Sequence, residues 1–234
     1  MVPMLVADRH PPPAPPQAAR IFGERMALAE RYVALLAGPG VERGVVGPRE
    51  TGRLWERHVL NCAVIGDLVP RACRVLDVGS GAGLPGIPLV LARPDLRVAL
   101  LEPMARRVAW LEEVTADLDL PVPVHRGRTG RHEGRVIGQD WDVVTARAVA
   151  PLGRLAAWCL PLVRTGGRLL ALKGASAQEE VARDGGQIRR AGGGDVEIVE
   201  CGAVVVEPPT TVVVMTRRRV GPASPARTRK DRRA

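Results

Sequence analysis

The sequence is poor in aromatic side chains, paired cysteines and long apolar runs. Aromatic residues fill only 3% of the 234 positions, which disfavours a protein that binds nucleic acid mainly by stacking bases on aromatic rings. The four cysteines form no CxxC pair and no Cys/His cluster with zinc spacing, so we expect buried, reduced thiols and no metal. Apolar runs such as Val212–Met215 are too short to cross a bilayer, and the first residues lack the features of a secretion signal. We therefore expect a cytoplasmic protein that does not enter a membrane.

Positive charge is concentrated at one end of the chain. Of the net charge of +9, residues 217–234 carry +7, from eight basic residues and one acid. Such a segment suits a polyanion, because neutralised phosphates release counterions, but it also serves as a solvated tail that aids solubility. The proline-rich start and the basic end of the sequence predict three regions. They are a disordered leader over 1–18, one domain over 19–216 and a disordered basic tail over 217–234.

Short apolar runs alternate with segments of helical periodicity along the chain. Two helical stretches come first, one from Ile21 to Leu36 that is closed by Gly38-Pro39-Gly40, and one from Leu54 to Leu68. The strands expected after them are Arg74–Val78, Arg97–Glu102, Val122–His125, Trp141–Ala146, Arg168–Lys173, Val196–Val199, Ala203–Val206 and Thr211–Met215. This order predicts a Rossmann-like α/β fold with N-terminal helices. The sheet is expected to be mostly parallel, with an antiparallel hairpin made by the last two strands.

A glycine-rich turn follows the first expected strand. It reads Asp77-Val78-Gly79-Ser80-Gly81-Ala82-Gly83, an acid and three glycines in a DxGxGxG pattern. Ligands of open parallel sheets bind at the carboxyl ends of the strands, where glycines let the backbone approach them closely. A dinucleotide fingerprint, GxGxxG, fits only if it starts late, at Gly81, and the acid beside the loop would repel a pyrophosphate. The pattern therefore favours S-adenosylmethionine, which carries no phosphate.

Two acids frame this expected cofactor site. Asp77 is expected to organise the ammonium group of the cofactor, directly or through water. Glu102, at the end of the second strand, is expected to accept hydrogen bonds from the ribose hydroxyls, although the ribose of a dinucleotide would suit it too. Glycines Gly79, Gly81 and Gly83 complete the cofactor site that these residues predict.

Four stretches resemble one bacterial family. They are Gly47-Pro48-Arg49-Glu50 with Glu56-Arg57-His58-Val59-Leu60; Leu76–Pro88, with its Leu84-Pro85-Gly86-Ile87-Pro88 extension; Arg106-Arg107-Val108; and Arg147-Ala148 with Ala171-Leu172-Lys173-Gly174. From about Ile21 to Met215 the sequence is similar to the RsmG (also called GidB) family of 16S ribosomal RNA guanine-N7 methyltransferases. The resemblance implies a class I methyltransferase fold that uses S-adenosyl-L-methionine.

The resemblance also implies particular contacts with the cofactor. They fall on Gly79 and Leu84 in the loop, on Thr129 and Gly130 after the third strand, and on Arg147 after the fourth. The family often has an acid near Gly130 that could hold the adenine amino group, whereas the nearest acid here is Glu133. A second departure is Asn61-Cys62, where many relatives have an aspartate and a serine.

Three side chains have both a functional and a structural interpretation. His58 is a candidate for contact with RNA or cofactor, or packs between helices. Lys173, at the carboxyl end of a strand, is a candidate for substrate phosphate. Arg147 orders the cofactor pocket, contacts phosphate, or pairs with an acid such as Asp142.

The resulting hypothesis is a monomeric enzyme that methylates N7 of one guanine in 16S rRNA, either naked or within the small ribosomal subunit. N7 carries a lone pair and no proton, so no residue is expected to serve as a catalytic base. Alternatives are a methyltransferase of another RNA or small substrate, and a non-catalytic RNA-binding protein on the same fold. The two acids at the expected cofactor site argue against the latter, and Asp77 disfavours a nicotinamide oxidoreductase.

Overall fold

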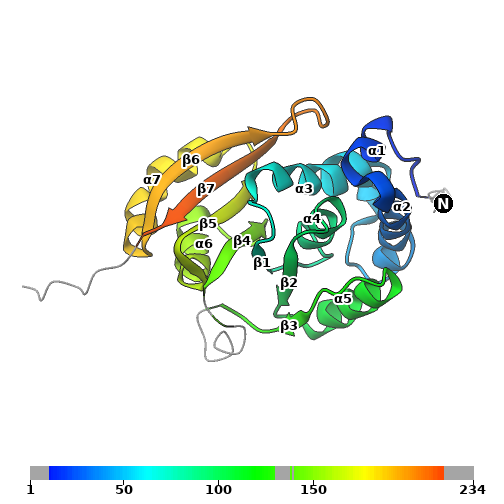
Figure 1. Cartoon of the computed structure of the whole chain (residues 1–234), viewed down its shortest axis with the longest axis horizontal. Helices are drawn as coiled ribbons and strands as arrows, with labels where there is room; N and C mark the ends of the chain where they lie inside the picture. Colours follow the sequence, from blue (N-terminus) through cyan, green and yellow to red (C-terminus); the bar gives the residue numbers. More distant parts are fainter. Residues whose placement is uncertain (1–10, 130–137, 139, 219–234) are drawn as a thin grey trace, which may run out of the picture.

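A seven-stranded sheet runs through the computed structural model, which describes residues 11–129, 138 and 140–218 (Figure 1). The strand order is β3-β2-β1-β4-β5-β7-β6. Strands β1 to β5 are parallel, and β7 runs antiparallel to both β5 and β6. The bounds are β1 (Arg74–Val78), β2 (Arg97–Glu102), β3 (Val124–Arg126), β4 (Trp141–Arg147), β5 (Val163–Lys173), β6 (Gly193–Cys201) and β7 (Thr210–Arg217). This is the mostly parallel α/β sheet that the sequence predicts.

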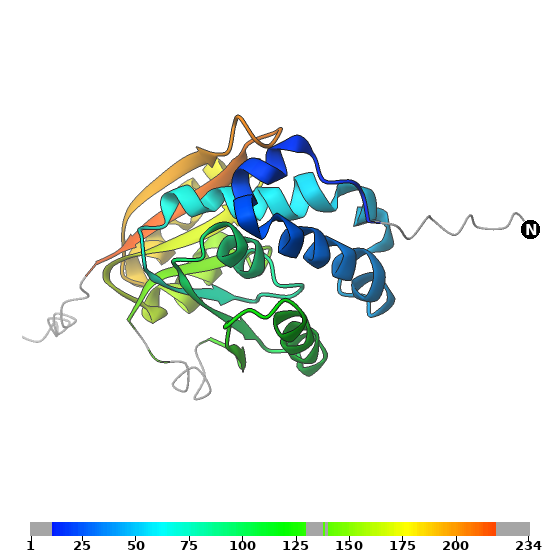
Figure 2. The same cartoon turned by 45° about the vertical axis from the view of Figure 1, so that its right-hand side comes forward.

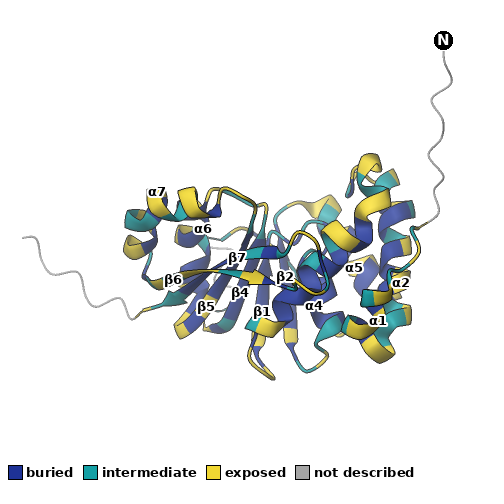
Figure 3. Ribbon diagram, turned by 90° about the horizontal axis from the view of Figure 1, so that it is seen from above, coloured by how far each residue is buried: buried dark blue, intermediate teal, exposed yellow. Residues whose placement is uncertain are grey.

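Helices cover both faces of the sheet and bury its central strands (Figure 3). One face packs against α6 (Leu152–Cys159) and α7 (Ala177–Arg190). The other packs against α4 (Gly86–Ala92), α5 (Ala105–Asp117) and the N-terminal helices. Strands β1 and β4 are buried along almost their whole length because both of their faces are covered.

The N-terminal helices lie together beside α4, on the side of the molecule away from α7 (Figures 1 and 2). They are α1 (Pro16–Phe22), η1 (Gly23–Arg25), α2 (Met26–Leu35), η2 (Leu36–Gly40), η3 (Pro48–Arg53), η4 (Leu54–Leu60), α3 (Asn61–Ala63) and η5 (Val64–Leu68). The first expected helix differs from the observed one in two ways. It is interrupted by the tight turn η1, and it continues through Pro39 as the wider π-helical turn η2 instead of closing there.

The expected boundary of the leader is too late. Helix α1 begins at Pro16. Proline, which has no backbone N–H, suits the first turn because the N–H groups there have no partner within the helix. Ala18, within the expected leader, is fully buried. Upstream, the indole Nε1 of Trp55 donates a hydrogen bond of 2.9 Å to the Pro12 carbonyl. Residues 1–10 of the expected leader lie outside the described residues.

The C-terminal hairpin is present, but its first strand is not Ala203–Val206. The hairpin pairs β6 with β7, for example Ile198 with Val213, and residues 203–206 form the connecting turn. Gly202, with φ +71°, starts a turn in which its carbonyl accepts the backbone N–H groups of Val205 and Val206. A valine run is therefore used here to close a turn, which strand propensity alone does not reveal.

The expected basic tail begins later than residue 217. Strand β7 includes Arg217, and Arg218 pairs with Asp195, so the first two residues of the expected tail belong to the ordered edge of the sheet. Residues 219–234 lie outside the described residues.

The four cysteines are free and buried, as expected. Within the described part of the chain, no helix combines the length and apolar character that a membrane span needs.

Candidate cofactor and substrate site

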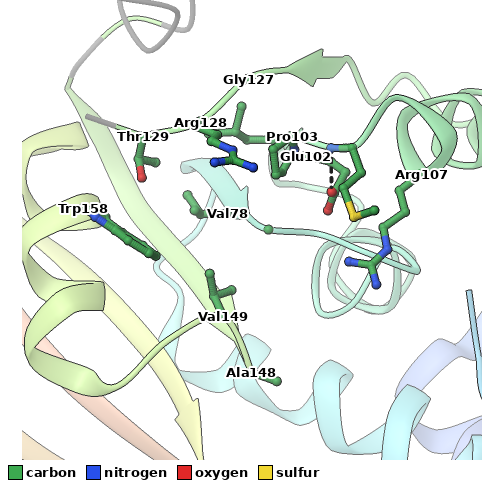
Figure 4. A pocket seen from close by; sticks show the side chains of 13 residues that line it. Val78, Glu102, Pro103, Arg107, Gly127, Arg128, Thr129, Ala148, Val149 and Trp158 are labelled. Carbon is green, nitrogen blue, oxygen red and sulfur yellow. Dashed lines mark hydrogen bonds between the residues drawn. The ribbon is translucent and has the colours of Figure 1, made fainter. Parts of the chain in front are cut away.

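A cavity of about 680 Å³ opens at the carboxyl ends of β1, β2, β3 and β4 (Figure 4). This is the edge of the sheet at which ligands of doubly wound folds bind, next to the point where the strand order reverses. The lining residues are Val78, Gly79, Leu101, Glu102, Pro103, Met104, Arg107, Gly127, Arg128, Thr129, Ala148, Val149 and Trp158.

The three glycines of the loop have different tasks. All have positive φ, from +57° at Gly81 to +107° at Gly83. A Cβ on Gly79 would lie 2.7 Å from a methyl carbon of Val149, within the cavity wall. A Cβ on Gly83 would instead collide with Ile87 at the start of α4. Gly79 therefore keeps the cavity open, whereas Gly83 lets the loop pack closely on the helix that follows.

Asp77 lies behind the loop and not in the cavity. Its side chain is fully buried; Oδ2 accepts the backbone N–H of Gly86 at 3.2 Å, and Oδ1 accepts the Thr145 hydroxyl at 2.9 Å. Burial raises the pKa of Asp77 to about 6, despite these hydrogen bonds. Direct contact with the ammonium group of a cofactor is thus not what the geometry offers. Asp77 joins β1, β4 and the start of α4, and it places negative charge behind the loop.

Glu102 lies in the cavity wall, as expected. Its carboxylate accepts the Gly81 N–H at 3.0 Å and the Met104 N–H at 2.9 Å, the latter drawn in Figure 4. Glu102 is the last residue of β2 and is only 1% exposed. The carboxylate lies in the cavity wall, beside a loop in which a side chain at Gly79 would clash with Val149. These residues fit the ribose and amino-acid parts of S-adenosylmethionine.

The remaining expected cofactor residues divide into three groups. Thr129 lines the cavity. Leu84 is half-buried, packs against the apolar core, and is not one of the lining residues. Gly130 and Glu133 lie outside the described residues, so the expected adenine contacts there stay predictions.

Most of the residues that line the cavity were not expected from the sequence, among them Arg107, Arg128, Val149 and Trp158. Arg107 comes from α5, Arg128 follows β3, Val149 follows β4, and Trp158 comes from α6 (Figure 4). No signal in the sequence places Trp158 in the cavity, because helical spacing does not distinguish a core position from a cavity wall. Arg107 was visible as part of the Arg106-Arg107 pair, but the pair was also typical of a solvated helix face.

Arg147 is bound to the N-terminal helices. Its Nη1 donates to Cys62 Sγ at 3.0 Å and its Nη2 donates to His58 Nδ1 at 2.7 Å, while His58 Nε2 bonds Glu50 Oε2 at 2.8 Å. Asp142, the alternative partner of Arg147, instead accepts from Arg164 and from a backbone N–H. His58 is therefore bonded through both ring nitrogens and lies one side chain away from the end of β4.

Lys173 has a structural role in place of the expected contact with substrate phosphate. Its Nζ donates to the Ala150 carbonyl at 3.0 Å and to Glu180 Oε2 at 2.8 Å, with the two side chains only 12% and 13% exposed. Glu180 also accepts the N–H of Leu152, and Asp184 accepts that of Gly153, so two acids of α7 cap the start of α6. Burial raises the pKa of Glu180, but the bonds from Lys173 and Leu152 outweigh it and leave the pKa below its usual value.

The fold and the site together define a class I S-adenosylmethionine-dependent methyltransferase. When bound, the cofactor supplies a methyl group activated on a sulfonium centre. Two solved structures share the fold. One is SibL, an S-adenosylmethionine-dependent methyltransferase, with a TM-score of 0.57 and 22% identity over 87% of this chain and 70% of that one. The other, from Methanococcus maripaludis, has a TM-score of 0.56 and 13% identity over 82% and 93%.

The chain belongs to the family described as GidB, rRNA small subunit methyltransferase G, whose model matches residues 25–206. Relatives named ribosomal RNA small subunit methyltransferase G are similar over most of their length. The protein of Salinispora tropica is 56% identical over 95% of this chain and 95% of its own. That of Rhodococcus jostii is 56% identical over 79% and 82%, and that of Salinispora arenicola is 53% identical over 97% and 98%.

Replacement of Glu102 by alanine is expected to weaken cofactor binding by roughly 1–3 kcal/mol, because the charge-assisted hydrogen bonds of the carboxylate are lost. The measurement is calorimetric titration of the full chain with S-adenosylhomocysteine. Glu113→Ala, at an exposed position of α5, is the matched control and should bind as the wild type does. A folded Glu102→Ala protein with wild-type affinity would contradict the assignment.

Proposed function

We propose that this protein transfers a methyl group from S-adenosyl-L-methionine to N7 of one guanine in 16S rRNA, presented as naked RNA or within the small ribosomal subunit. The observation that carries the proposal is that the chain belongs to the rRNA small subunit methyltransferase G family, whose model matches residues 25–206. The cavity at the carboxyl ends of the strands, which suits S-adenosylmethionine, agrees with this family. Guanine N7 as the acceptor atom is what the resemblance to the RsmG family implies, and the chemistry of the site supports it.

The cavity suits an acceptor that has no proton to lose. Of the described lining residues, only Glu102, Arg107 and Arg128 carry an ionisable side chain. Both oxygens of Glu102 already accept backbone N–H groups, and guanidinium groups do not act as bases near neutral pH. Guanine N7 attacks through a free lone pair, so alignment and electrostatics suffice. Strand β4 also ends in Arg147-Ala148, and not in an Asp-Pro-Pro-Tyr motif that would grip an exocyclic amine.

Basic side chains at the cavity support an RNA substrate. Arg107 and Arg128 line it, and Arg106 and Arg126 are exposed next to them on α5 and β3. Guanidinium groups bind phosphates through paired hydrogen bonds and add a salt-dependent attraction. The basic tail over 217–234 would add further phosphate contacts. We also propose that the protein acts as a monomer in the cytoplasm.

The test is to methylate 16S rRNA from cells that lack the protein, using the purified full chain, and then to treat the RNA with borohydride and aniline. N7-methylguanine carries a positive charge that labilises its glycosidic bond, so the RNA is expected to be cut at one guanine. The same assay with naked rRNA and with small subunits identifies the form that is accepted. Between about pH 7 and 9 the rate should stay flat, since no base has to remove a proton.

Two results would contradict this proposal. A methyl group that is stable to the cleavage chemistry, on cytosine or on an exocyclic amine, would exclude N7. Absence of transfer to either form of 16S rRNA, with transfer to another RNA or to a small molecule, would leave only the methyltransferase class. RNA without added cofactor serves as the control for strand breaks unrelated to methylation.

A further inference from the structure

Three side chains from separate parts of the chain form a hydrogen-bonded series beside the cavity. Glu50 comes from η3, His58 from η4, and Arg147 from the end of β4, 89 residues from His58 in sequence. Glu50 to His58 measures 2.8 Å and His58 to Arg147 2.7 Å, and the His58 side chain is only 13% exposed. The cofactor contacts deduced above leave Glu50 and His58 without a function.

The chemistry of the groups fixes which ring nitrogen of His58 carries the proton. A guanidinium has donors only, so Nδ1 of His58 must accept from Arg147. The single proton of the neutral ring is then on Nε2, where it is donated to the Glu50 carboxylate. Burial first, and then the Arg147 charge, lower the pKa of His58, against the bond to Glu50, which raises it. The hydrogen bond to His58 lowers the pKa of Glu50. The series is therefore carboxylate, neutral imidazole, guanidinium.

We propose that Glu50 and His58 are positioning residues that hold the Arg147 guanidinium ready for the carboxylate of the cofactor's methionine moiety. Arg147 uses two of its five N–H groups on His58 and Cys62, which leaves donors for an anion. The next two residues, Ala148 and Val149, line the cavity. Glu102 occupies the β2 side of the cavity, so the amino-acid end of the ligand falls towards β1 and β4, where Arg147 lies.

A neutral imidazole suits this task better than a carboxylate would. An aspartate or glutamate in direct contact with Arg147 would neutralise the charge that the ligand needs. His58 fixes the orientation of the guanidinium and leaves its positive charge available, while the negative charge of Glu50 stays one ring further away. Cys62 acts in the same sense: burial raises the pKa of its thiol, so it accepts the second Arg147 bond as a neutral group.

The decisive experiment compares two ligands that differ in the amino-acid part. S-adenosylhomocysteine carries the carboxylate, and methylthioadenosine lacks the whole amino-acid end. With the full chain, His58→Leu is expected to lower the affinity for S-adenosylhomocysteine roughly tenfold or more, and that for methylthioadenosine less than about twofold. Arg147→Met should show the same pattern, and His58→Gln, whose amide can accept from Arg147 and donate to Glu50, should restore most of the affinity.

Several outcomes would overturn the proposal. Equal losses for both ligands would show that His58 acts on the fold or on the whole cavity. Undiminished affinity for S-adenosylhomocysteine in folded His58→Leu would show that Arg147 needs no support. Full additivity of His58→Leu and Arg147→Met would show that the two residues act separately. Thermal melts of the unliganded variants establish that each is folded.

The wild-type chain provides a test that needs no substitution. When His58 is protonated, Nδ1 becomes a donor facing Arg147 Nη2, and the contact breaks. The charged groups around His58 are Glu50 on η3, Arg57 on η4 and Arg147 on β4, with Arg53 acting on Glu50. As the pH falls below the usual histidine range, affinity for S-adenosylhomocysteine should drop more than that for methylthioadenosine, and His58→Gln should reduce this difference. Protonation of Asp77, near pH 6, also acts on the ammonium end that only S-adenosylhomocysteine carries, so the contribution of His58 is the difference between the wild-type and the His58→Gln profiles. Parallel pH profiles for the two ligands would contradict the proposal.

Discussion

Replacement of Gly79 by valine is expected to abolish cofactor binding. The residue has φ +71°, a conformation that costs a side chain about 1–2 kcal/mol and a β-branched one more. Its Cβ would lie 2.7 Å from a methyl carbon of Val149, so the new side chain either fills the cavity or pushes its wall. Calorimetric titration with S-adenosylhomocysteine is expected to show a loss of more than about 100-fold.

A set of paired variants separates the clash from the backbone strain. Gly79→Ala should weaken binding, and addition of Val149→Ala should recover part of it, because the second substitution removes the atoms that the new Cβ meets. Gly52→Val is the control, since the added side chain there would meet no atom within 4 Å and the backbone has no positive φ. Unchanged affinity in a folded Gly79→Val protein would refute the placement of the cofactor in this cavity.

Asp77 is expected to make the unliganded protein less stable as the pH rises. Its pKa in the folded state is about 6, and burial is the cause, whereas an unfolded aspartate has a pKa just below 4. A group whose pKa is raised by folding gives its full contribution below the unfolded pKa and loses it as the pH rises through the folded pKa. The free energy of unfolding should therefore fall between about pH 4 and 6, by about 3 kcal/mol from this group.

The Asp77→Asn variant tests this directly. Its amide can rotate to accept from the Gly86 N–H and donate to the Thr145 hydroxyl, without an ionisable group. Urea unfolding should show similar stability to the wild type at pH 4 and greater stability at pH 8, with weaker binding of the cationic cofactor. Asp67→Asn, at an exposed position, controls for the loss of one negative charge. An Asp77→Asn protein that keeps the wild-type pH slope would show that another group is responsible.

The ionised Asp77 carboxylate is expected to lower the stability of the unliganded protein and to strengthen cofactor binding. These opposite effects indicate a functional role for the buried acid. The cofactor carries an ammonium and a sulfonium, and Asp77 places negative charge behind the loop that we expect to receive them. Its ionisation is unfavourable in the unliganded protein and becomes less so when the ligand's positive charge arrives. We therefore expect cofactor binding to lower the pKa of Asp77.

The features predicted from sequence are those that depend on neighbours in the chain. Strand β1, the positive-φ glycines and Glu102 at the end of β2 each follow from a local pattern of apolar runs, glycines and acids. Ala203–Val206 was assigned wrongly because a valine run has the composition of a strand, and only the turn started by Gly202 decides otherwise.

The features missed depend on residues far apart in sequence. Lys173 looked like a free cation at a strand end until α7 placed Glu180 against it. The contact between His58 and Arg147 joins a helix to a strand across 89 residues, and no periodicity signals it. Trp158 belongs to the cavity because of how α6 lies against β4, which the helix's own sequence does not determine.

The capping of α6 by acids of α7 links the shape of the cavity to residues that do not line it. Ala148 and Val149, which form one cavity wall, are separated by two residues from Leu152 and Gly153, whose N–H groups are held by Glu180 and Asp184. The position of this wall therefore depends on a helix on the far side of the sheet from the glycine loop. Exchanges at positions 180 and 184 should reshape the cavity without replacing any residue that lines it.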